Sequence, residues 1–169
     1  WVRYFDTLSV EYLNNLSQES ETFSKKPTIS IVMPVFNPNI EYLKQAIQSV
    51  LNQTYRNWEL CIADDASDSK SVLETLKEFS SSDKRIKVCL SKHNNHISAC
   101  SNLAASKVTG EFIALLDHDD LLRPHALHFL VKAINLNKEP VLIYSDEDKI
   151  DEFNRRFSPF FKTDWNPEL

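Results

Sequence analysis

The sequence predicts an α/β domain in which a mainly parallel sheet is covered by helices on both faces. From Pro27 onward, short apolar runs alternate with stretches in which apolar residues recur at helical spacing. The apolar runs are continuous rather than alternating, which is typical of strands that are buried on both faces. The chain has 169 residues, of which 42% are hydrophobic and 25% charged, so it is long and apolar enough to build a core.

Residues 1–26 are expected to form a separate N-terminal helical extension or linker, and residues 27–169 the main domain. Within the extension, six apolar residues recur near helical spacing: Tyr4, Phe5, Leu8, Tyr12, Leu13 and Leu16. The polar stretch from Ser17 to Lys26 then interrupts the pattern. The extension therefore has the character of a helix that docks from a preceding region.

The first half of the main domain predicts two strands and the helices beside them. Ile29–Met33 is a short apolar run that Pro34 ends, which indicates a strand. The helix after it presents one apolar face, made of Ile40, Leu43, Ile47, Val50 and Leu51. Trp58–Ala63 indicates the second strand, and Asp64 to Ser69 have the composition of a turn and a helix start. The next helix has its apolar face at Val72, Leu73, Leu76 and Phe79.

The second half continues the alternation. Ile86–Leu90 predicts the third strand, and a helix from about Ile97 to Lys107 leads to a strand at Phe112–Leu116. Pro124 suits the first turn of a fourth helix, since its missing N–H has no partner there in any case. That helix points Leu127, Leu130, Val131 and Ile134 inward. Val141–Tyr144 is the expected fifth strand.

Composition excludes several kinds of ligand site. Gly110 is the only glycine, so the chain has no glycine-rich loop of the kind that holds phosphates in P-loop and dinucleotide-binding proteins. The net charge of −5 argues against nucleic acid as the main ligand, because a phosphate-backbone binder needs a basic face. No apolar run approaches the roughly 20 residues of a membrane span. Cys61, Cys89 and Cys100 are interpreted as reduced core thiols of a cytoplasmic protein.

Acidic residues follow three of the four informative strands. In parallel α/β sheets, ligands bind beyond the carboxyl ends of the strands. The candidate positions are therefore Val35–Asn37, Asp64–Ser67, Asp117–Asp120 and Tyr144–Asp148. All but the first of these segments carry carboxylates, so a cation or a hydroxyl-rich ligand is expected at this edge.

The segment Asp117–Asp120 places three carboxylates in four positions directly after a buried strand. If this segment is extended, Asp117 and Asp119 share one face and His118 points away. Hard cations such as Mg²⁺ or Mn²⁺ take oxygen ligands of this kind and complete their shell with phosphate and water. The alternative is that these acids only cap helices and form turns.

Two further strand exits each allow two interpretations. Asp64 and Asp65 either cap the next helix or accept hydrogen bonds from a nucleobase or a ribose. Phe36 either covers the flat face of a nucleobase or fills the core. Spacing alone does not separate these interpretations.

An ordered set of motifs over about residues 27–169 resembles the family 2 glycosyltransferases. The motifs are "PTISIVMPVFN", "SVLNQTYRNWELCIADDASDS", "ASKVTGEFIALLDHDDLLRPHAL", "IYSDEDKID" and "FKTDWNP". They look most like bacterial enzymes that build surface polysaccharides, including rhamnosyltransferase-like ones. The resemblance implies a GT-A (Rossmann-like) fold that binds a nucleotide sugar.

The resemblance also implies roles for individual positions. Pro34, Val35 and Phe36 match the turn that borders the nucleobase, and Asp65 matches the residue that recognises the base. Asp117 matches the first acid of the Asp-x-Asp motif, near the ribose and diphosphate, and Asp119 matches the direct metal ligand. The remaining nucleotide-sugar-binding positions are His118, inside the motif, and Asn102, in the helix before it.

The implied activity is metal-dependent, inverting transfer of a sugar from UDP or dTDP to a saccharide or lipid-linked acceptor in surface polysaccharide synthesis. The metal is expected to be Mn²⁺ or Mg²⁺. Family members continue into an acceptor-binding half that supplies the catalytic base, so we expect the chain to be the nucleotide-sugar-binding part of a longer protein, peripheral to the inner face of the membrane. The alternative is a non-catalytic nucleotide-binding or docking module.

Two features bear on this resemblance. His96 stands where the family generally has glycine, which leaves the shape of that loop open. No residue clearly fills the role of the base. Asp146, Glu147 and Asp148 either line the site or serve a structural role.

Overall fold

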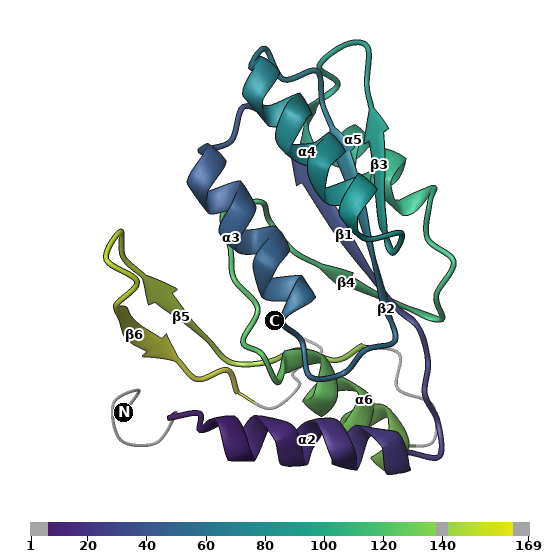
Figure 1. The fold of residues 1–169 in the computed structure, drawn as a ribbon, viewed down its shortest axis with the longest axis vertical. Coiled ribbons are helices and arrows are strands. Elements are labelled where there is room, and N and C mark those ends of the chain that lie inside the picture. The colour runs from purple at the N-terminus through teal and green to yellow at the C-terminus, as the bar shows by residue number, and fades with distance from the viewer. Residues whose placement is uncertain (1–6, 138–141, 164–169) are drawn as a thin grey trace.

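The computed structural model describes residues 7–137 and 142–163. Its centre is a parallel sheet with the strand order β3-β2-β1-β4 (Figure 1). The strands are β1 (Ile29–Val35), β2 (Trp58–Asp64), β3 (Ile86–Leu90) and β4 (Phe112–Leu115). The helices are α2 (Val10–Thr22), α3 (Ile40–Leu51), α4 (Lys70–Ser82), α5 (His96–Ala105) and α6 (Ala126–Leu136). The predicted α/β class with a parallel sheet is therefore confirmed.

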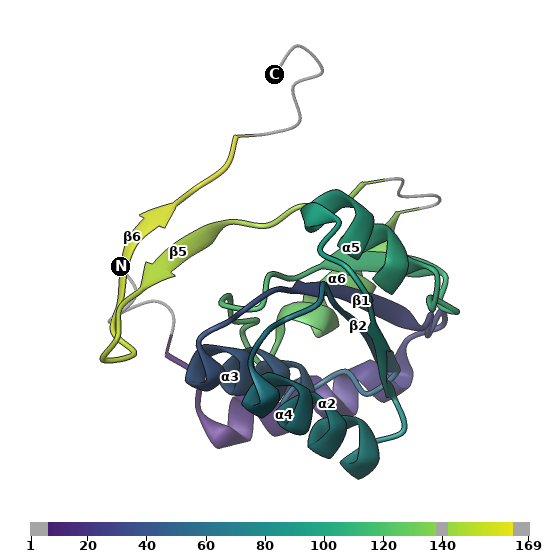
Figure 2. The same ribbon diagram turned by 90° about the horizontal axis from the view of Figure 1, so that it is seen from above.

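Helices cover both faces of the sheet (Figure 2). Successive residues of β1 point to opposite faces, so Ile31 and Met33 enter the larger core and Val32 enters the smaller one. The larger core is formed with apolar residues of α3, α4 and α6. The smaller core lies under α5, where Cys100 and Ala104 pack near Val32. Cys61 and Cys100 are buried free thiols in this smaller core, and Cys89 is half-buried beside it.

The first strand is longer than predicted and runs through Pro34 to Val35. Proline lacks an N–H and is tolerated in a strand where no ladder bond is needed. The last residue pair between β1 and β4 is Val32 with Leu115, so β4 has ended before it reaches Pro34. The ladder with β2 continues to Val35.

The N-terminal helix also extends beyond its predicted end. The polar residues after Ser17 do not break α2, which continues to Thr22. Ser9 caps the helix by accepting a hydrogen bond from the Tyr12 N–H at 3.0 Å. Tyr4 and Phe5 lie outside the described residues. The helix packs on α6, so polar residues such as Ser20 are buried between the two helices.

The expected fifth strand at Val141–Tyr144 is wrong for its described part. Leu142 and Tyr144 are 64% and 42% exposed and belong to no strand, and Val141 lies outside the described residues. The next strands, β5 (Glu147–Ile150) and β6 (Arg156–Phe160), pair antiparallel as a separate two-stranded sheet. This hairpin extends away from the parallel sheet (Figure 2). The apolar run 141–144 predicted burial, but a strand also needs a neighbouring strand with which to pair.

Candidate functional site

The strand order creates one topological switch point. The chain passes from β1 to β2 and β3 in one direction, and then returns across the sheet to place β4 on the other side of β1. Open α/β sheets bind ligands at the carboxyl ends of the strands where the order reverses. The exits of β1, β2 and β4 therefore form the candidate site, and this is the edge at which the sequence places its acids.

The exit of β1 presents an aromatic side chain to solvent. Val35 is 1% exposed and packs into the core, whereas Phe36, the next residue, is 44% exposed. Of the two interpretations of Phe36, the core plug is therefore wrong. The carbonyl oxygen of Val35 accepts the Asp65 N–H at 2.8 Å, so this residue links the exits of β1 and β2. Pro34 is half-buried.

The acids after β2 are buried and hold neighbouring loops. Both oxygens of the Asp65 carboxylate accept the Asn95 N–H, at 3.0 and 3.1 Å, and Asp65 is 2% exposed. The Asp64 carboxylate accepts the Ser67 N–H at 3.0 Å. The N-cap of α4 is Ser69, so neither acid caps that helix. Each Asp65 oxygen has lone pairs left over, so the carboxylate can accept a further hydrogen bond from a ligand.

The acidic segment after β4 is a turn and not an extended run. The Asp120 N–H donates to the Asp117 carbonyl oxygen at 3.2 Å, which closes the turn. The expectation that Asp117 and Asp119 alternate with His118 as in a strand is therefore wrong, because β4 ends at Leu115. The His118 Nδ1 lies 3.3 Å from the Pro34 carbonyl oxygen, so this turn is held against the exit of β1.

Negative charge is concentrated in this turn. Burial raises the pKa of the Asp120 carboxyl, and the nearby charges of Asp119, Asp117 and Glu147 raise it further. Such crowding favours a bound cation, because a positive charge relieves the repulsion among the carboxylates. Asp117 and Asp119 are exposed and offer oxygen ligands. The donor chemistry therefore fits Mg²⁺ or Mn²⁺.

A cation bound in the turn would need ligands in addition to the side chains that the structure describes there. Within residues 7–137 and 142–163, no three His, Cys, Asp or Glu side chains group closely enough to hold a metal ion. Mg²⁺ is commonly held by one or two carboxylates together with phosphate oxygens and water. The turn matches that kind of incomplete site.

Other predicted residues lie away from the switch point or have structural partners. Asn102 is exposed in the second turn of α5, about 9 Å of helical rise beyond the first residue of that helix. The acids Asp146, Glu147 and Asp148 were expected either to line the site or to serve a structural role. Asp146 accepts the Lys162 N–H at 2.8 Å, Glu147 pairs with Lys162 at 2.9 Å, and Asp148 pairs with Arg156 at 2.6 Å. These contacts favour the structural role.

Polar residues to which the sequence analysis assigned no individual role connect the strand exits. They are Asn37 after β1, Ser67 and Asp68 after β2, and Asn95 after β3. Asn37, which follows Val35 and Phe36, was the signal in the sequence for such a contact. Asparagine tolerates left-handed backbone conformations better than most residues, and Asn37 adopts one, with φ of 42°. His96 adopts a left-handed conformation with φ of 65°, which is one that glycine favours, so the loop keeps this shape without glycine.

Comparison with known proteins identifies relatives of this chain. The family model described as "Glycosyl transferase family 2" matches residues 30–166. An uncharacterized protein, y4gI, of Sinorhizobium fredii is 44% identical over 154 residues, which are 91% of this chain and 17% of that protein. The O-antigen biosynthesis protein RfbC of Myxococcus xanthus is 34% identical over 146 residues, which are 86% of this chain and 12% of that protein. The chain thus spans less than a fifth of the length of these two relatives.

Solved structures share the fold. S. aureus TarS 1-349 in complex with UDP superposes with a TM-score of 0.58 and 18% identity, covering 76% of this chain and 43% of that one. The mannosyltransferase PcManGT from Pyrobaculum calidifontis in complex with GDP-Man and Mn²⁺ superposes with a TM-score of 0.59 and 15% identity, covering 79% and 41%. The fold is therefore of the GT-A type found in these transferases.

Proposed function

Because the chain belongs to glycosyl transferase family 2, we propose that its switch-point edge binds the nucleoside-diphosphate part of a sugar donor, UDP or dTDP. The sugar is transferred with inversion to a saccharide or lipid-linked acceptor. The observation that carries this proposal is the position of the acidic turn Asp117–Asp120 beside the exposed Phe36 at the switch point. The aromatic face suits the nucleobase, and the cation site suits the diphosphate of the same ligand.

Phe36 and Asp65 are assigned to the nucleoside. Stacking of a nucleobase on an aromatic side chain contributes about 1–3 kcal/mol in single-strand complexes, and the exposed ring of Phe36 offers such a face. The Asp65 carboxylate retains acceptor capacity for a base N–H. A pyrimidine such as uracil or thymine carries one N–H on its pairing edge, which suits this acceptor.

Asp119, with Asp117, is assigned to a divalent cation, Mn²⁺ or Mg²⁺, on the diphosphate. When bound, the cation neutralises the charge of the departing nucleoside diphosphate. The carboxylates hold it at the edge where Phe36 and Asp65 orient the nucleoside. With the nucleotide held in this way, the sugar carbon is oriented for attack by the acceptor hydroxyl from the opposite side, which inverts its configuration. No described residue of this chain is assigned as the base that removes the acceptor proton.

The acceptor is proposed to be a growing cell-surface polysaccharide or its lipid-linked precursor. The relatives include an O-antigen biosynthesis protein, a hyaluronan synthase of Pasteurella multocida and a chondroitin synthase of Escherichia coli. The names of all three refer to the synthesis of a polysaccharide. Among the described helices, none combines the length and the apolar character needed to cross a membrane.

The proposal is tested by calorimetric titration of UDP into the chain with Mn²⁺, and again with EDTA. Binding that requires Mn²⁺ is expected, and Asp119→Ala should abolish the metal-dependent part. Glu78→Ala, which removes an exposed acid on α4, is the matched control and should bind like the wild type. Unchanged UDP affinity in Asp119→Ala would show that the metal site is wrongly assigned.

The alternative is a non-catalytic nucleotide-binding or docking module. A docking module should bind none of UDP, dTDP and GDP, with or without Mn²⁺, whereas a nucleotide-binding module should bind one of them without supporting sugar transfer. Sugar-transfer activity of a protein that contains this chain, eliminated by Asp119→Ala, would rule this alternative out.

A further inference from the structure

Three neighbouring strand exits each contain one non-glycine residue in the left-handed region. They are Asn37 after β1, Ala66 after β2 and His96 after β3, with φ of 42°, 62° and 65°. A non-glycine residue in this region costs about 1–2 kcal/mol, and asparagine tolerates it best. Strained residues persist only when the surrounding structure determines them, and they cluster at binding sites. The edge assigned to the nucleotide is therefore built from strained backbone that other contacts must hold.

Asn37 makes the contacts that hold the exits of β1 and β2 together. Its N–H donates to the Ser67 Oγ at 2.9 Å. Its side-chain Oδ1 accepts the Asp68 N–H at 2.9 Å, and its Nδ2 donates to the Asp68 Oδ2 at 3.2 Å. Asn37 thus contributes three hydrogen bonds between the two exits, two of which depend on its amide side chain.

The same linkage continues to the exit of β3. The Asp65 N–H donates to the Val35 carbonyl oxygen at 2.8 Å, and the Asp65 carboxylate holds the Asn95 N–H. Asn95 in turn donates through its Nδ2 to Ser91 Oγ at 3.1 Å. Phe36 adjoins Asn37 in the chain and Asp65 is bonded to Val35 and Asn95, so this network sets the positions of both before any ligand arrives.

We propose that Asn37 is a positioning residue of the nucleotide site, which acts by locking the exits of β1 and β2 through its side-chain contacts with Asp68. This inference rests on the proposed function, because it concerns the same edge. Asn37 touches no ligand in this role. A preformed site binds more tightly since the ordering of Phe36 and Asp65 is already complete in the free protein.

The test is Asn37→Gly. Glycine adopts the left-handed conformation without strain, so the fold is retained while both side-chain hydrogen bonds are lost. We expect UDP affinity in the presence of Mn²⁺ to fall about tenfold, as the net loss of one to two hydrogen bonds implies. The midpoint of thermal unfolding should stay within about 4 °C of the wild type, because the relief of strain offsets part of the loss.

Asn154→Gly is the matched control. Asn154 is also left-handed, with φ of 59°, but it lies in the turn of the β5–β6 hairpin. This variant should bind UDP like the wild type. Equal losses of affinity in the two variants would show that removal of a left-handed asparagine has a general effect, and would overturn the proposal.

A double variant tests the geometry directly. In Asn37→Asp/Asp68→Asn the carboxylate and the amide exchange places. The carboxylate at position 37 can then accept two hydrogen bonds from residue 68, one from its backbone N–H and one from its new side-chain amide. The single variant Asn37→Asp instead sets two carboxylates against each other. We expect Asn37→Asp to weaken UDP binding by tenfold or more and the double variant to restore it to within about threefold. A double variant no better than the single one would contradict the proposal.

Hydrogen exchange of the free protein separates this inference from the proposed function. In Asn37→Gly the amides of Asp65 and Asn95, which do not contact residue 37, should exchange faster than in the wild type. Unchanged exchange at both amides would contradict the positioning role whatever the nucleotide result. Absence of UDP binding by the wild type would contradict the proposed function and leave the exchange result to decide whether Asn37 orders this edge.

Discussion

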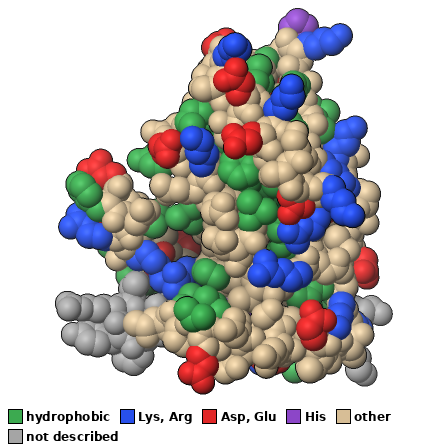
Figure 3. Space-filling view, viewed as in Figure 1, with side chains coloured by type: hydrophobic (Ala, Val, Ile, Leu, Met, Phe, Trp, Pro, Cys, Tyr) green, Lys and Arg blue, Asp and Glu red, His purple; other side chains and the backbone are tan. Residues whose placement is uncertain are grey.

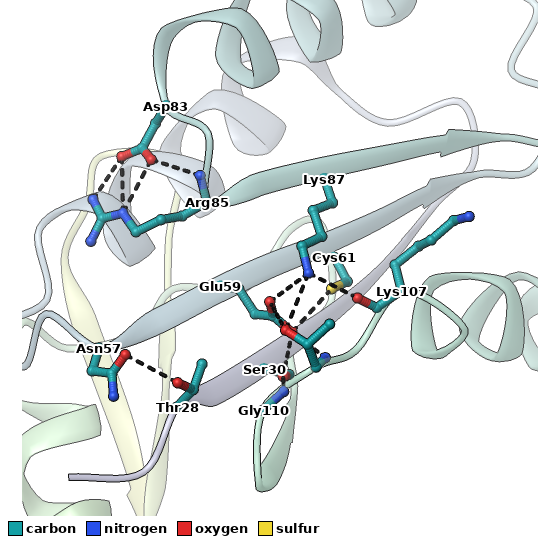
Figure 4. Close-up of polar contacts among 11 residues, drawn as sticks. Thr28, Ser30, Asn57, Glu59, Cys61, Asp83, Arg85, Lys87, Lys107 and Gly110 are labelled. Carbon is teal, nitrogen blue, oxygen red and sulfur yellow. Dashed lines mark hydrogen bonds and ion pairs between the residues drawn. The ribbon is translucent and has the colours of Figure 1, made fainter.

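Glu59 is a buried carboxylate near the amino end of β2, whereas the proposed nucleotide site lies at the carboxyl ends of the strands. Figure 4 shows its polar contacts. Glu59 is 6% exposed and accepts hydrogen bonds from the Lys87 Nζ at 2.6 Å, the Thr109 N–H at 2.6 Å and the Ser30 Oγ at 2.7 Å. Burial by itself raises the pKa of the carboxyl, but these donors outweigh it and lower the pKa from 4.5 to about 2. The charged carboxylate therefore ties β1, β2, β3 and the approach to β4 together.

Glu59→Gln should lower the free energy of unfolding by about 2–4 kcal/mol at pH 7. The substitution removes the negative charge with which the Lys87 ammonium group pairs, and it weakens the hydrogen bonds from Thr109 and Ser30. The pKa of about 2 in the folded state lies below the ordinary 4.5. The stabilisation is therefore complete above pH 4.5 and is lost as the pH falls through about 2. Urea unfolding at pH 7 and pH 3 is the measurement, and the difference between wild type and variant should shrink at pH 3.

The control for this prediction is Glu111→Gln, which removes an exposed carboxylate at the same end of the sheet. It should change stability by less than about 0.5 kcal/mol. A difference between wild type and Glu59→Gln that is the same at both pH values would contradict the charged role of Glu59.

Gly110, the single glycine, lies in this cluster. Its N–H donates to the Ser30 Oγ at 3.0 Å. A Cβ at this position would lie 2.3 Å from the Thr28 carbonyl oxygen, which is too close for any other residue. The chain thus has glycine where backbone must approach backbone, and has asparagine, alanine and histidine at the left-handed positions of the strand exits proposed to bind the nucleotide.

At the scale of elements, α2 is joined to the main domain through α6. The imidazole of His128 is fully buried, with its Nδ1 2.8 Å from the Ser20 Oγ. Burial lowers the pKa of His128, so the ring is held neutral between the two helices. Lys132 of α6 pairs with Glu19 of α2 at 2.7 Å. These contacts lie on the helices rather than at the exits of the parallel strands.

Leu16→Ala should lower the free energy of unfolding by about 2–4 kcal/mol, since Leu16 is 5% exposed and its removal leaves a cavity under α2. Val10→Ala, on the same helix but 75% exposed, is the matched control and should change stability by less than about 0.5 kcal/mol. Urea unfolding measures both. If Leu16→Ala matches the control, α2 does not contribute to the stability of the domain.

At the scale of the whole molecule, the two ends of the parallel strands differ in their role. The amino ends hold the Glu59 cluster, and the carboxyl ends carry the acidic turn and the left-handed residues of the strand exits. Basic and acidic side chains are interspersed over the face shown in Figure 3, in keeping with a net charge of −5. An anionic ligand at the acidic edge is therefore expected to depend on a cation rather than on a basic surface.

Binding at this edge should stabilise the whole domain. UDP at 100 times its dissociation constant, with Mn²⁺, should add about 2.7 kcal/mol to the free energy of unfolding. For a domain of this size that raises the midpoint of thermal unfolding by about 5–10 °C. Thermal unfolding followed by circular dichroism measures the shift. A shift of the same size in EDTA would contradict the role of the cation.

Local sequence patterns determined the elements and the chemistry of the edge. Continuous apolar runs predicted four of the strands to within two residues at each end. Their composition matches burial on both faces only for β1 and β2, because Ile113 and Leu115 of β4 are 56% and 79% exposed. The predicted strands also located the acids. Because Asp65, Asp117, Asp119 and Asp120 follow predicted strands closely in the sequence, they were expected at the strand exits. The run at Val141–Tyr144 misled, since an apolar run carries no information about whether a neighbouring strand is available.

Only the tertiary structure decided how these parts combine. The order β3-β2-β1-β4, which places the acidic turn beside Phe36, depends on packing of the whole sheet. The contact of Asn37 with Asp68 joins residues 31 positions apart, and that of Ser20 with His128 joins residues 108 apart. Periodicity and composition report whether a residue is buried, but the partner that a buried or strained residue meets is set by distant segments of the chain.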